Sequence, residues 1–183
     1  MRRTLREPAF AICALTLLLN ARQARATRVA VDLLAGYGFN EAYRVGFGAR
    51  GGFTLAQNVY VGGAFVLHQG RTGVRTERGA TPQTTPLYFG PEGGYDFQMS
   101  QVTLRTYLGV GYALILSSID ESCSASSCPT DTSTGGALAI WPGAALIWST
   151  NGLSLGADVR YVAVLGSSYQ NAPAAFATAG LRF

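Results

Sequence analysis

The chain has 183 residues, of which 48% are hydrophobic and only 13% are charged, so one ordinary domain is expected and the composition is unusual for a soluble globule. It contains 23 glycines and no lysine. The formal net charge of +4 is confined to the first 26 residues, because nine arginines and nine carboxylates balance from Thr27 onward, and this excludes a basic footprint for a nucleic acid.

The first 26 residues have the three parts of a secretory signal peptide. Arginines at the start precede an apolar run from Ala9 to Leu19, and the small residues of Ala24-Arg25-Ala26 offer a cleavage site. An eleven-residue run is too short to remain as a membrane anchor, since a helix needs about 20 residues to cross a bilayer. We therefore expect a cleaved signal peptide over residues 1–26 and one mature domain over residues 27–183.

Eight runs with period-two alternation follow, and no stretch after residue 27 has the pattern of an amphipathic helix. The runs are Val29 to Phe39, Tyr43 to Leu55, Val59 to Gln69, Leu87 to Gln98, Val102 to Leu116, Leu138 to Trp148, Leu153 to Leu165 and Ala174 to Phe183. Every second connection is tight, whereas residues 70–86 and 117–136 form long connections. This rhythm is typical of an up-and-down barrel with short turns at one end and loops at the other.

The charged residues inside the runs all share a phase opposite to the large apolar side chains. They are Asp32, Arg44, Arg50, Glu92, Asp96, Arg105, Asp158, Arg160 and Arg182. Because successive side chains of a strand alternate, nine such agreements would arise by chance roughly once in 500. The pattern therefore indicates strands with two distinct faces.

Two orientations of those faces are open. With the apolar face inward, the chain would be a soluble exported ligand-binding barrel. The many glycines and the absence of lysine favour the apolar face outward, because eight strands leave an interior just wide enough to be filled by a few polar side chains. The runs of 10 to 15 residues also match the length needed to cross hydrocarbon with tilt.

The chain resembles the small bacterial outer-membrane β-barrels of the OmpA transmembrane-domain and OmpX type. The resemblance rests on the eight-run plan, the segment Phe89-Gly-Pro-Glu-Gly-Gly-Tyr-Asp-Phe97, a weaker echo at Ile140-Trp-Pro-Gly-Ala, and the final Ala-Gly-Leu-Arg-Phe. It implies an all-β, eight-stranded antiparallel up-and-down transmembrane β-barrel in the outer membrane, in contact with lipid and lipopolysaccharide. It also implies that the barrel-assembly machinery recognises Leu181 and Phe183. The short first connection, Asn40 to Ala42, departs from that family.

The nine charged residues are expected to face one another inside the barrel. Arginine without lysine suits this arrangement, since a planar guanidinium binds two carboxylate oxygens in fixed geometry and stays charged. The network is interpreted either as a gate or ion path, or as a fixed plug that fills the lumen. We favour the plug, because buried charges are retained when they are paired.

His68 supports an enzyme hypothesis, because some outer-membrane barrels modify lipid A with a histidine and a serine near the outer rim. No serine and carboxylate can be assigned to His68 from spacing, so a polar rim residue is the preferred interpretation. The segment Gly46-Phe-Gly-Ala-Arg-Gly51 matches a dinucleotide motif in letters only, because no helix follows it. We therefore predict a protein that is not an enzyme and needs no cofactor.

Cys123 and Cys128 are the only cysteines after the signal segment, and an exported chain meets an oxidising compartment, so a local disulfide is expected. A metal site would need two further ligands, and none is predicted. The connections 70–86 and 117–136 are rich in threonine, serine and glycine. They are candidates for a surface ligand or adhesion, with simple connectors as the alternative.

Aromatic residues near the run ends are interpreted as girdles at the two membrane interfaces. They are Tyr37, Phe39, Tyr43, Phe97, Tyr112, Trp148 and Phe183. The function predicted from the sequence is an integral outer-membrane barrel that is structural or interacts through its outer loops.

Overall fold

The computed structural model describes residues 26–55, 57–71, 83–119, 131–166 and 171–183. The elements are β1 (Ala26–Gly38), the 3-10 turn η1 (Glu41–Tyr43), β2 (Val45–Leu55), β3 (Val59–Arg71), β4 (Gln83–Met99), β5 (Val102–Ile119), β6 (Asp131–Thr150), β7 (Leu153–Val164) and β8 (Ala172–Arg182). The predicted signal segment before Ala26 and the predicted Cys123–Cys128 disulfide lie outside the described residues.

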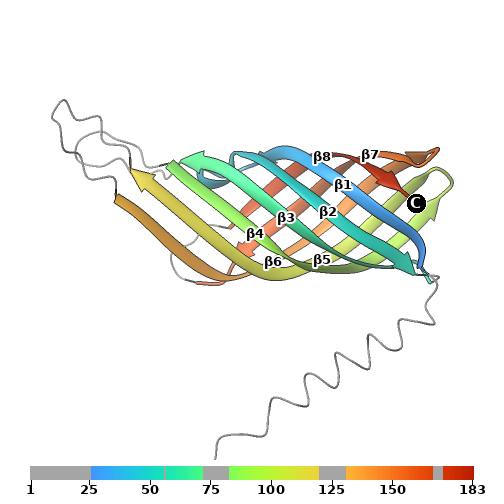
Figure 1. Ribbon diagram of the computed structural model, residues 1–183, viewed down its shortest axis with the longest axis horizontal. Coiled ribbons are helices and arrows are strands. Elements are labelled where there is room, and N and C mark those ends of the chain that lie inside the picture. Colours follow the sequence, from blue (N-terminus) through green and yellow to red (C-terminus); the bar gives the residue numbers. More distant parts are fainter. Residues whose placement is uncertain (1–25, 56, 72–82, 120–130, 167–170) are drawn as a thin grey trace, which may run out of the picture.

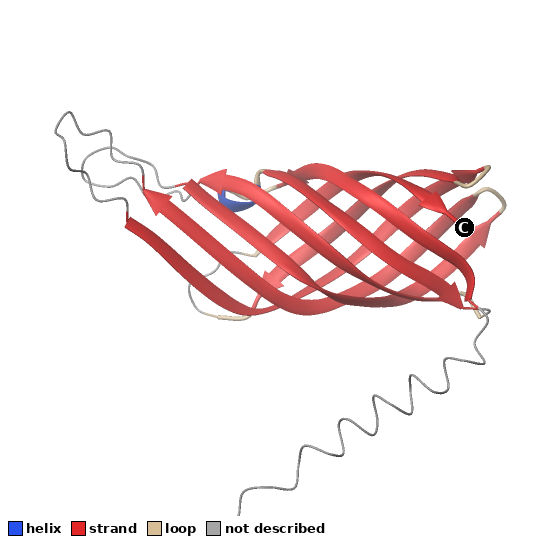
Figure 2. Cartoon of the chain, viewed as in Figure 1, coloured by secondary structure: helices blue, strands red, loops and turns tan. Residues whose placement is uncertain are grey.

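The eight strands form a closed antiparallel barrel in which each strand pairs with its neighbours in the sequence (Figure 1). The wall closes between β1 and β8, from Ala30 opposite Arg182 to Gly38 opposite Ala174. The main chains of Val29 and Phe183 add two reciprocal hydrogen bonds of 3.0 and 2.9 Å. The predicted eight-stranded up-and-down barrel is confirmed, and Figure 2 shows that almost all of the described chain is strand.

Three tight turns lie at one end of the barrel, which we call the turn end. Asn58, Ser100 and Asn151 have φ angles of 62°, 58° and 47°, which lie in the left-handed region that short polar side chains tolerate best. The last residues of β8 also lie at this end (Figure 1). The opposite end, where the chain passes from β3 to β4 and from β5 to β6, is the loop end.

The strands extend further toward the loop end than the sequence predicts. β3 continues to Arg71, which pairs with Gln83 of β4, and β5 continues to Ile119, which pairs with Asp131 of β6. The predicted connections 70–86 and 117–136 are therefore wrong at their ends. Main-chain hydrogen bonds between strands do not need apolar side chains, and threonine is a good strand former. Polarity alone therefore made both predicted connections longer than they are.

The two faces of the wall differ as predicted. Large apolar side chains point outward, and Leu33, Phe47 and Val159 are 66%, 53% and 55% exposed. The side chains between them in the sequence point inward and are mostly buried. Among the described residues, no helix has the length and apolar character to cross a membrane.

Candidate functional site

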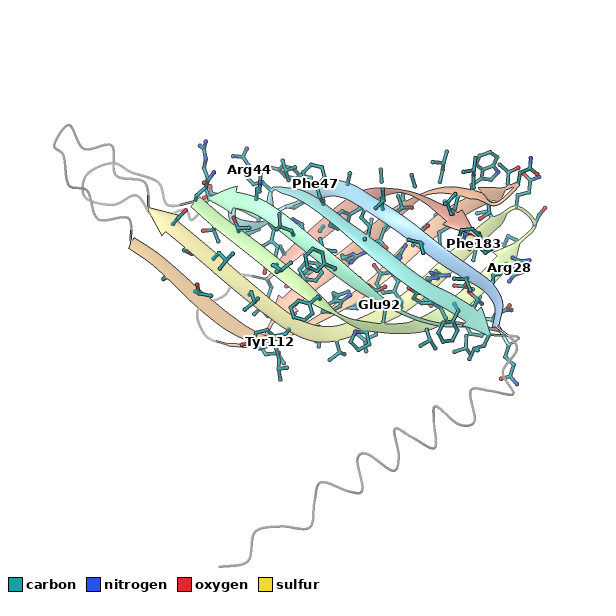
Figure 3. All side chains as sticks on the ribbon, in the orientation of Figure 1. Arg28, Arg44, Phe47, Glu92, Tyr112 and Phe183 are labelled. Atoms are coloured by element: carbon teal, nitrogen blue, oxygen red, sulfur yellow. The ribbon has the colours of Figure 1, made fainter. Side chains whose placement is uncertain are left out.

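The interior of the barrel is divided into two layers. In the half toward the turn end, seven charged side chains are buried, each at most 4% exposed, and we call them the charged layer: Asp32, Arg50, Glu92, Asp96, Arg105, Asp158 and Arg160. In the half toward the loop end lies an aromatic layer, built around Tyr43, His68, Tyr88, Trp141 and Phe176. Seven of the nine residues predicted to form a charge network are thus brought together, and Figure 3 shows Glu92 inside the wall.

Asp96 and Arg105 form one buried pair. They lie opposite each other on β4 and β5, and the Arg105 Nε and Nη2 atoms donate to the two carboxylate oxygens at 2.7 and 2.8 Å. The Thr54 hydroxyl donates to Asp96 at 2.7 Å. The Arg105 guanidinium also lies 3.5 Å from the centre of the Tyr60 ring. This bidentate pair is the strong form of a charged hydrogen bond.

Asp158 is the centre of a second cluster, which links opposite walls of the barrel. Arg50 of β2 donates to it at 2.6 Å, and Arg160 of β7 donates at 2.8 Å. The Tyr107 hydroxyl lies 2.9 and 2.8 Å from its two oxygens. Side chains from β2, β5 and β7 therefore donate hydrogen bonds to one carboxylate, and these bonds hold the charged layer in place.

Glu92 and Asp32 complete the charged layer. The indole Nε1 of Trp141 donates to Glu92 at 2.8 Å, and the Nη1 atom of Arg160 lies 3.7 Å from the same oxygen. Asp32 accepts a hydrogen bond of 3.0 Å from the Ser154 hydroxyl and lies 3.8 Å from Arg50 Nε. Each of the four carboxylates therefore has a polar partner, as buried charges require.

His68 is fully buried in the aromatic layer, so the predicted rim position is wrong. Its Nδ1 atom donates to the main-chain oxygen of Tyr43 at 3.0 Å. Its ring stacks on Tyr88, with centroids 5.9 Å apart, and meets Tyr43 and Phe176 edge-on. β3 continues past His68 to Arg71, and three aromatic rings surround the imidazole. His68 is therefore not placed to meet a lipid at the outer surface.

Arg44 and Tyr43 exchange the positions that the sequence predicts for them. Arg44 is exposed outside the wall, where its Nε donates to the Tyr37 hydroxyl at 3.1 Å (Figure 3), whereas Tyr43 is 1% exposed and covers the interior. The cause is η1, whose start is capped by Asn40, because this turn interrupts the alternation until β2 begins at Val45. Burial raises the pKa of Tyr43 to about 12.

Arg182 lies only half-buried near the turn end, so it borders the charged layer rather than joining it. The other predicted residues of the last strand face outward, where Leu181 and Phe183 are 49% and 76% exposed. Of the predicted girdle aromatics, Tyr37, Phe39, Phe97, Tyr112, Trp148 and Phe183 are exposed, and Tyr43 is the exception.

Sequence reasoning missed three aromatic residues that contact the charged layer or adjoin it. The Tyr60 ring stacks against the Arg105 guanidinium, and the Trp141 indole donates to Glu92. The centre of the Phe176 ring lies 5.0 Å from the Arg160 guanidinium carbon. Each occupies an alternate position of its strand where the neighbouring residues on the same face are small. This pattern could have indicated that the rings face inward, because a large ring among glycines and alanines on the inward face fills the lumen.

Among the described residues, no group of three or more histidine, cysteine or acidic side chains is placed to hold a metal ion. The site is therefore a set of paired charges and stacked rings. Its chemistry is mutual neutralisation, which fixes the interior of the barrel.

The fold and this interior define a class of protein: small eight-stranded barrels with an apolar outer face and a filled polar lumen. In fold, the chain is similar to solved structures of outer-membrane barrel proteins. A major outer membrane protein of Thermus thermophilus aligns with a TM-score of 0.63 at 12% identity, covering 85% of this chain and 98% of that one. Ail, the attachment invasion locus protein of Yersinia pestis, solved with the heparin analogue sucrose octasulfate, aligns with a TM-score of 0.54 at 14% identity over 85% and 97%.

The N-terminal β-barrel domain of Pseudomonas aeruginosa OprF aligns with a TM-score of 0.51 at 18% identity, covering 88% of this chain and all of that one. At these identities the likeness establishes the shared fold, as the predicted resemblance to small outer-membrane barrels implies. No family model matches the sequence, and no curated protein matches it.

Proposed function

We propose that the chain is an exported integral protein of the bacterial outer membrane, not an enzyme, whose filled barrel presents a binding surface at the loop end. The observation that carries the proposal is the inversion of polarity across the wall. Large apolar side chains cover the outside of β1 to β7, and β8 adds small apolar side chains and Leu181, while paired charges occupy the inside. A soluble barrel would need the reverse, since monomeric soluble proteins rarely expose apolar patches larger than a few hundred Å².

Membrane insertion is tested by fractionation and gel mobility. The protein is expected in the detergent-extracted membrane fraction, with the folded form migrating differently from the heated form. Recovery in the soluble periplasmic fraction would contradict the proposal and favour the soluble ligand-binding barrel. The contacts with lipid and lipopolysaccharide follow from insertion.

The interior acts as a plug in this proposal. The pair of Asp158 with Arg50 crosses the lumen from β7 to β2, the pairs of Asp96 with Arg105 and of Asp158 with Arg160 fill it along the wall, and the aromatic layer lies over them. Single-channel recordings of the purified protein in planar bilayers are therefore expected to show no large steady conductance. A large steady conductance would instead favour the gate or ion path.

The binding surface is an unpaired strand edge. β6 pairs with β5 up to Asp131 opposite Ile119, but its pairing with β7 begins at Ala139 opposite Val164, and one further main-chain bond joins Leu165 to Leu138. Within the described ranges, no strand therefore pairs with the edge of residues 131–137 that faces away from β5 (Figure 1). Such an edge can accept an extended segment of a partner by main-chain hydrogen bonds.

Adhesion through this edge is tested with charge substitutions. The double variant Ser133→Lys with Gly135→Lys should lower binding of expressing cells to matrix proteins, because lysines on an edge oppose strand addition. Gln57→Lys, an exposed position at the turn end, is the matched control and should leave binding unchanged. Equal binding by all three proteins would remove adhesion from the proposal. The name of Ail, an attachment invasion locus protein, supports this choice of assay.

Assembly is proposed to use the outward side chains of Leu181 and Phe183 as the signal for the barrel-assembly machinery. Both are exposed on the last strand. Phe183→Ala should reduce the amount of folded barrel in cells, and an unchanged amount would contradict this role.

A lipid A modifying activity is the weaker candidate, because His68 is enclosed by Tyr43, Tyr88 and Phe176. Release of fatty acid from lipopolysaccharide by the wild type, lost in His68→Ala, would restore it.

A further inference from the structure

The free edge of residues 131–137, which we call the β6 edge, belongs to the part of the barrel that extends furthest at the loop end. β5 and β6 stay paired as far as Ile119 opposite Asp131, and Figure 1 shows both strands extending beyond the others at that end. The last large apolar side chain on the outside of β6 is Leu138, which directly precedes the paired part of the wall. Seven residues span roughly 24 Å at about 3.4 Å per residue. The β6 edge therefore leaves the apolar outer band of the barrel.

The β6 edge has none of the features that usually prevent the addition of another strand. Natural edge strands are protected by charged side chains, prolines or bulges. Residues 132–137 read Thr-Ser-Thr-Gly-Gly-Ala and contain neither a charge nor a proline. The register between β5 and β6 has no break, so no bulge turns the edge away. Ser133, Thr134 and Gly136 are exposed. An extended partner can therefore pair with this edge.

The β6 edge is also complementary to itself in antiparallel pairing. With Thr134 opposite the Thr134 of a second copy, Ser133 lies opposite Gly135, and Asp131 lies opposite Ala137. No two carboxylates then face each other, and threonine pairs across strands are favourable. Both copies use the same surface, which is the symmetric form of contact that most homo-oligomers have.

The direction of the strands determines where the second copy lies. Two identical strands pair antiparallel about a twofold axis perpendicular to their sheet. Because the barrel wall stands across the membrane, this axis lies in the membrane plane and the second copy is inverted. Within one membrane the axis would follow the membrane normal, and strands tilted by about 35–45° would cross at roughly twice that angle. Strands that cross so steeply form no ladder, so the second copy belongs to a facing membrane.

We propose that the β6 edge pairs antiparallel with the β6 edge of a second copy in a facing membrane, with Thr134 at the twofold axis. The two walls then join into one continuous sheet between the membranes. One contact of seven residues is short, and many copies on two apposed surfaces act together by multivalency. This inference rests on the proposed function, because it names the partner of the binding surface at the loop end.

The test uses two populations of phosphatidylcholine vesicles that carry the folded full-length barrel and two different dyes. Wild-type vesicles are expected to tether to each other and not to vesicles without protein. Thr134→Lys and Thr134→Glu should each reduce tethering among their own vesicles by about tenfold or more, because like charges then oppose each other in every contact. Mixing the Thr134→Lys population with the Thr134→Glu population should restore tethering between the two dyes, because opposite charges then meet.

Gln57→Lys, an exposed position at the turn end, is the matched control and should tether as the wild type does. Undiminished tethering by Thr134→Lys, or no recovery in the mixed populations, would overturn the proposal. So would wild-type vesicles that do not tether, or that tether equally to vesicles without protein. Heat-dependent gel mobility shows that each variant is folded and inserted. A failure of self-pairing is thereby distinguished from a failure of membrane insertion, and binding to matrix proteins is measured separately.

Discussion

Replacing Arg105 with methionine should destabilise the barrel far more than its size change suggests. The substitution removes two hydrogen bonds of 2.7 and 2.8 Å to Asp96 and the guanidinium that lies 3.5 Å from the Tyr60 ring. Asp96 then keeps only the Thr54 hydroxyl among the partners described above. Breaking a buried ion pair on one side costs about 3–5 kcal/mol, because the remaining charge is uncompensated.

This loss corresponds to a change of roughly two to three and a half orders of magnitude in the unfolding equilibrium constant. It can be measured by urea titration of the protein in lipid vesicles, with gel mobility reporting the folded fraction. The double variant Arg105→Met with Asp96→Asn should recover at least half of the loss, since it no longer buries an unpaired charge. Arg44→Met, at an exposed site, should change the free energy of unfolding by less than about 0.5 kcal/mol.

Unfolding of Arg105→Met at the same urea concentration as the wild type would show that the buried pair does not stabilise the barrel. A double variant no more stable than the single one would show that the cost comes from lost packing rather than from charge.

Gly109→Ala should lower the free energy of unfolding by about 1–3 kcal/mol in the same urea titration, because its new methyl group would overlap the Trp141 indole that binds Glu92. The control is Gly93→Ala on β4, whose methyl group would meet no atom within 4 Å and should leave the stability unchanged. Equal effects of the two substitutions would contradict this packing. Single cysteines at Phe47 and Val159, introduced into a chain with serine at Cys123 and Cys128, should resist a water-soluble thiol reagent in intact cells, because both side chains are predicted to face lipid. Free labelling at both would invert the orientation of the wall. Mass spectrometry of the purified protein should give a mature chain that begins at Thr27 and is two hydrogens lighter than the reduced form, and a retained leader or two free thiols would contradict the export predictions.

Alternation along the chain was sufficient to find all eight strands. Each face of a strand meets one environment, so residues such as Phe47 and Val159 on one face, and Arg50 and Asp158 on the other, repeat with period two. The same rule failed at Tyr43 and Arg44, because a 3-10 turn has a different period and shifts the phase of what precedes the strand.

The partners inside the barrel could not be predicted from the pattern. Arg50 and Asp158 are 108 residues apart and lie on β2 and β7, so their contact depends on the stagger and tilt of the closed wall rather than on local sequence. The aromatic partners Tyr60 and Trp141 were missed for a related reason. A ring with a polar atom can serve either face of a strand, and its hydrophobicity alone suggests the outer one.

The join between β1 and β8 has a consequence for how the protein is made. Ala30 and Arg182 are neighbours in space but belong to the first and the last strand, so the barrel cannot close until all eight strands have been delivered. Until that moment two unsatisfied borders of hydrogen-bonding groups remain open to any other chain. A chaperone that covers these two strand edges would protect the open barrel until β8 pairs with β1. Assembly therefore depends on how soon the last strand arrives as well as on how strongly the strands pair.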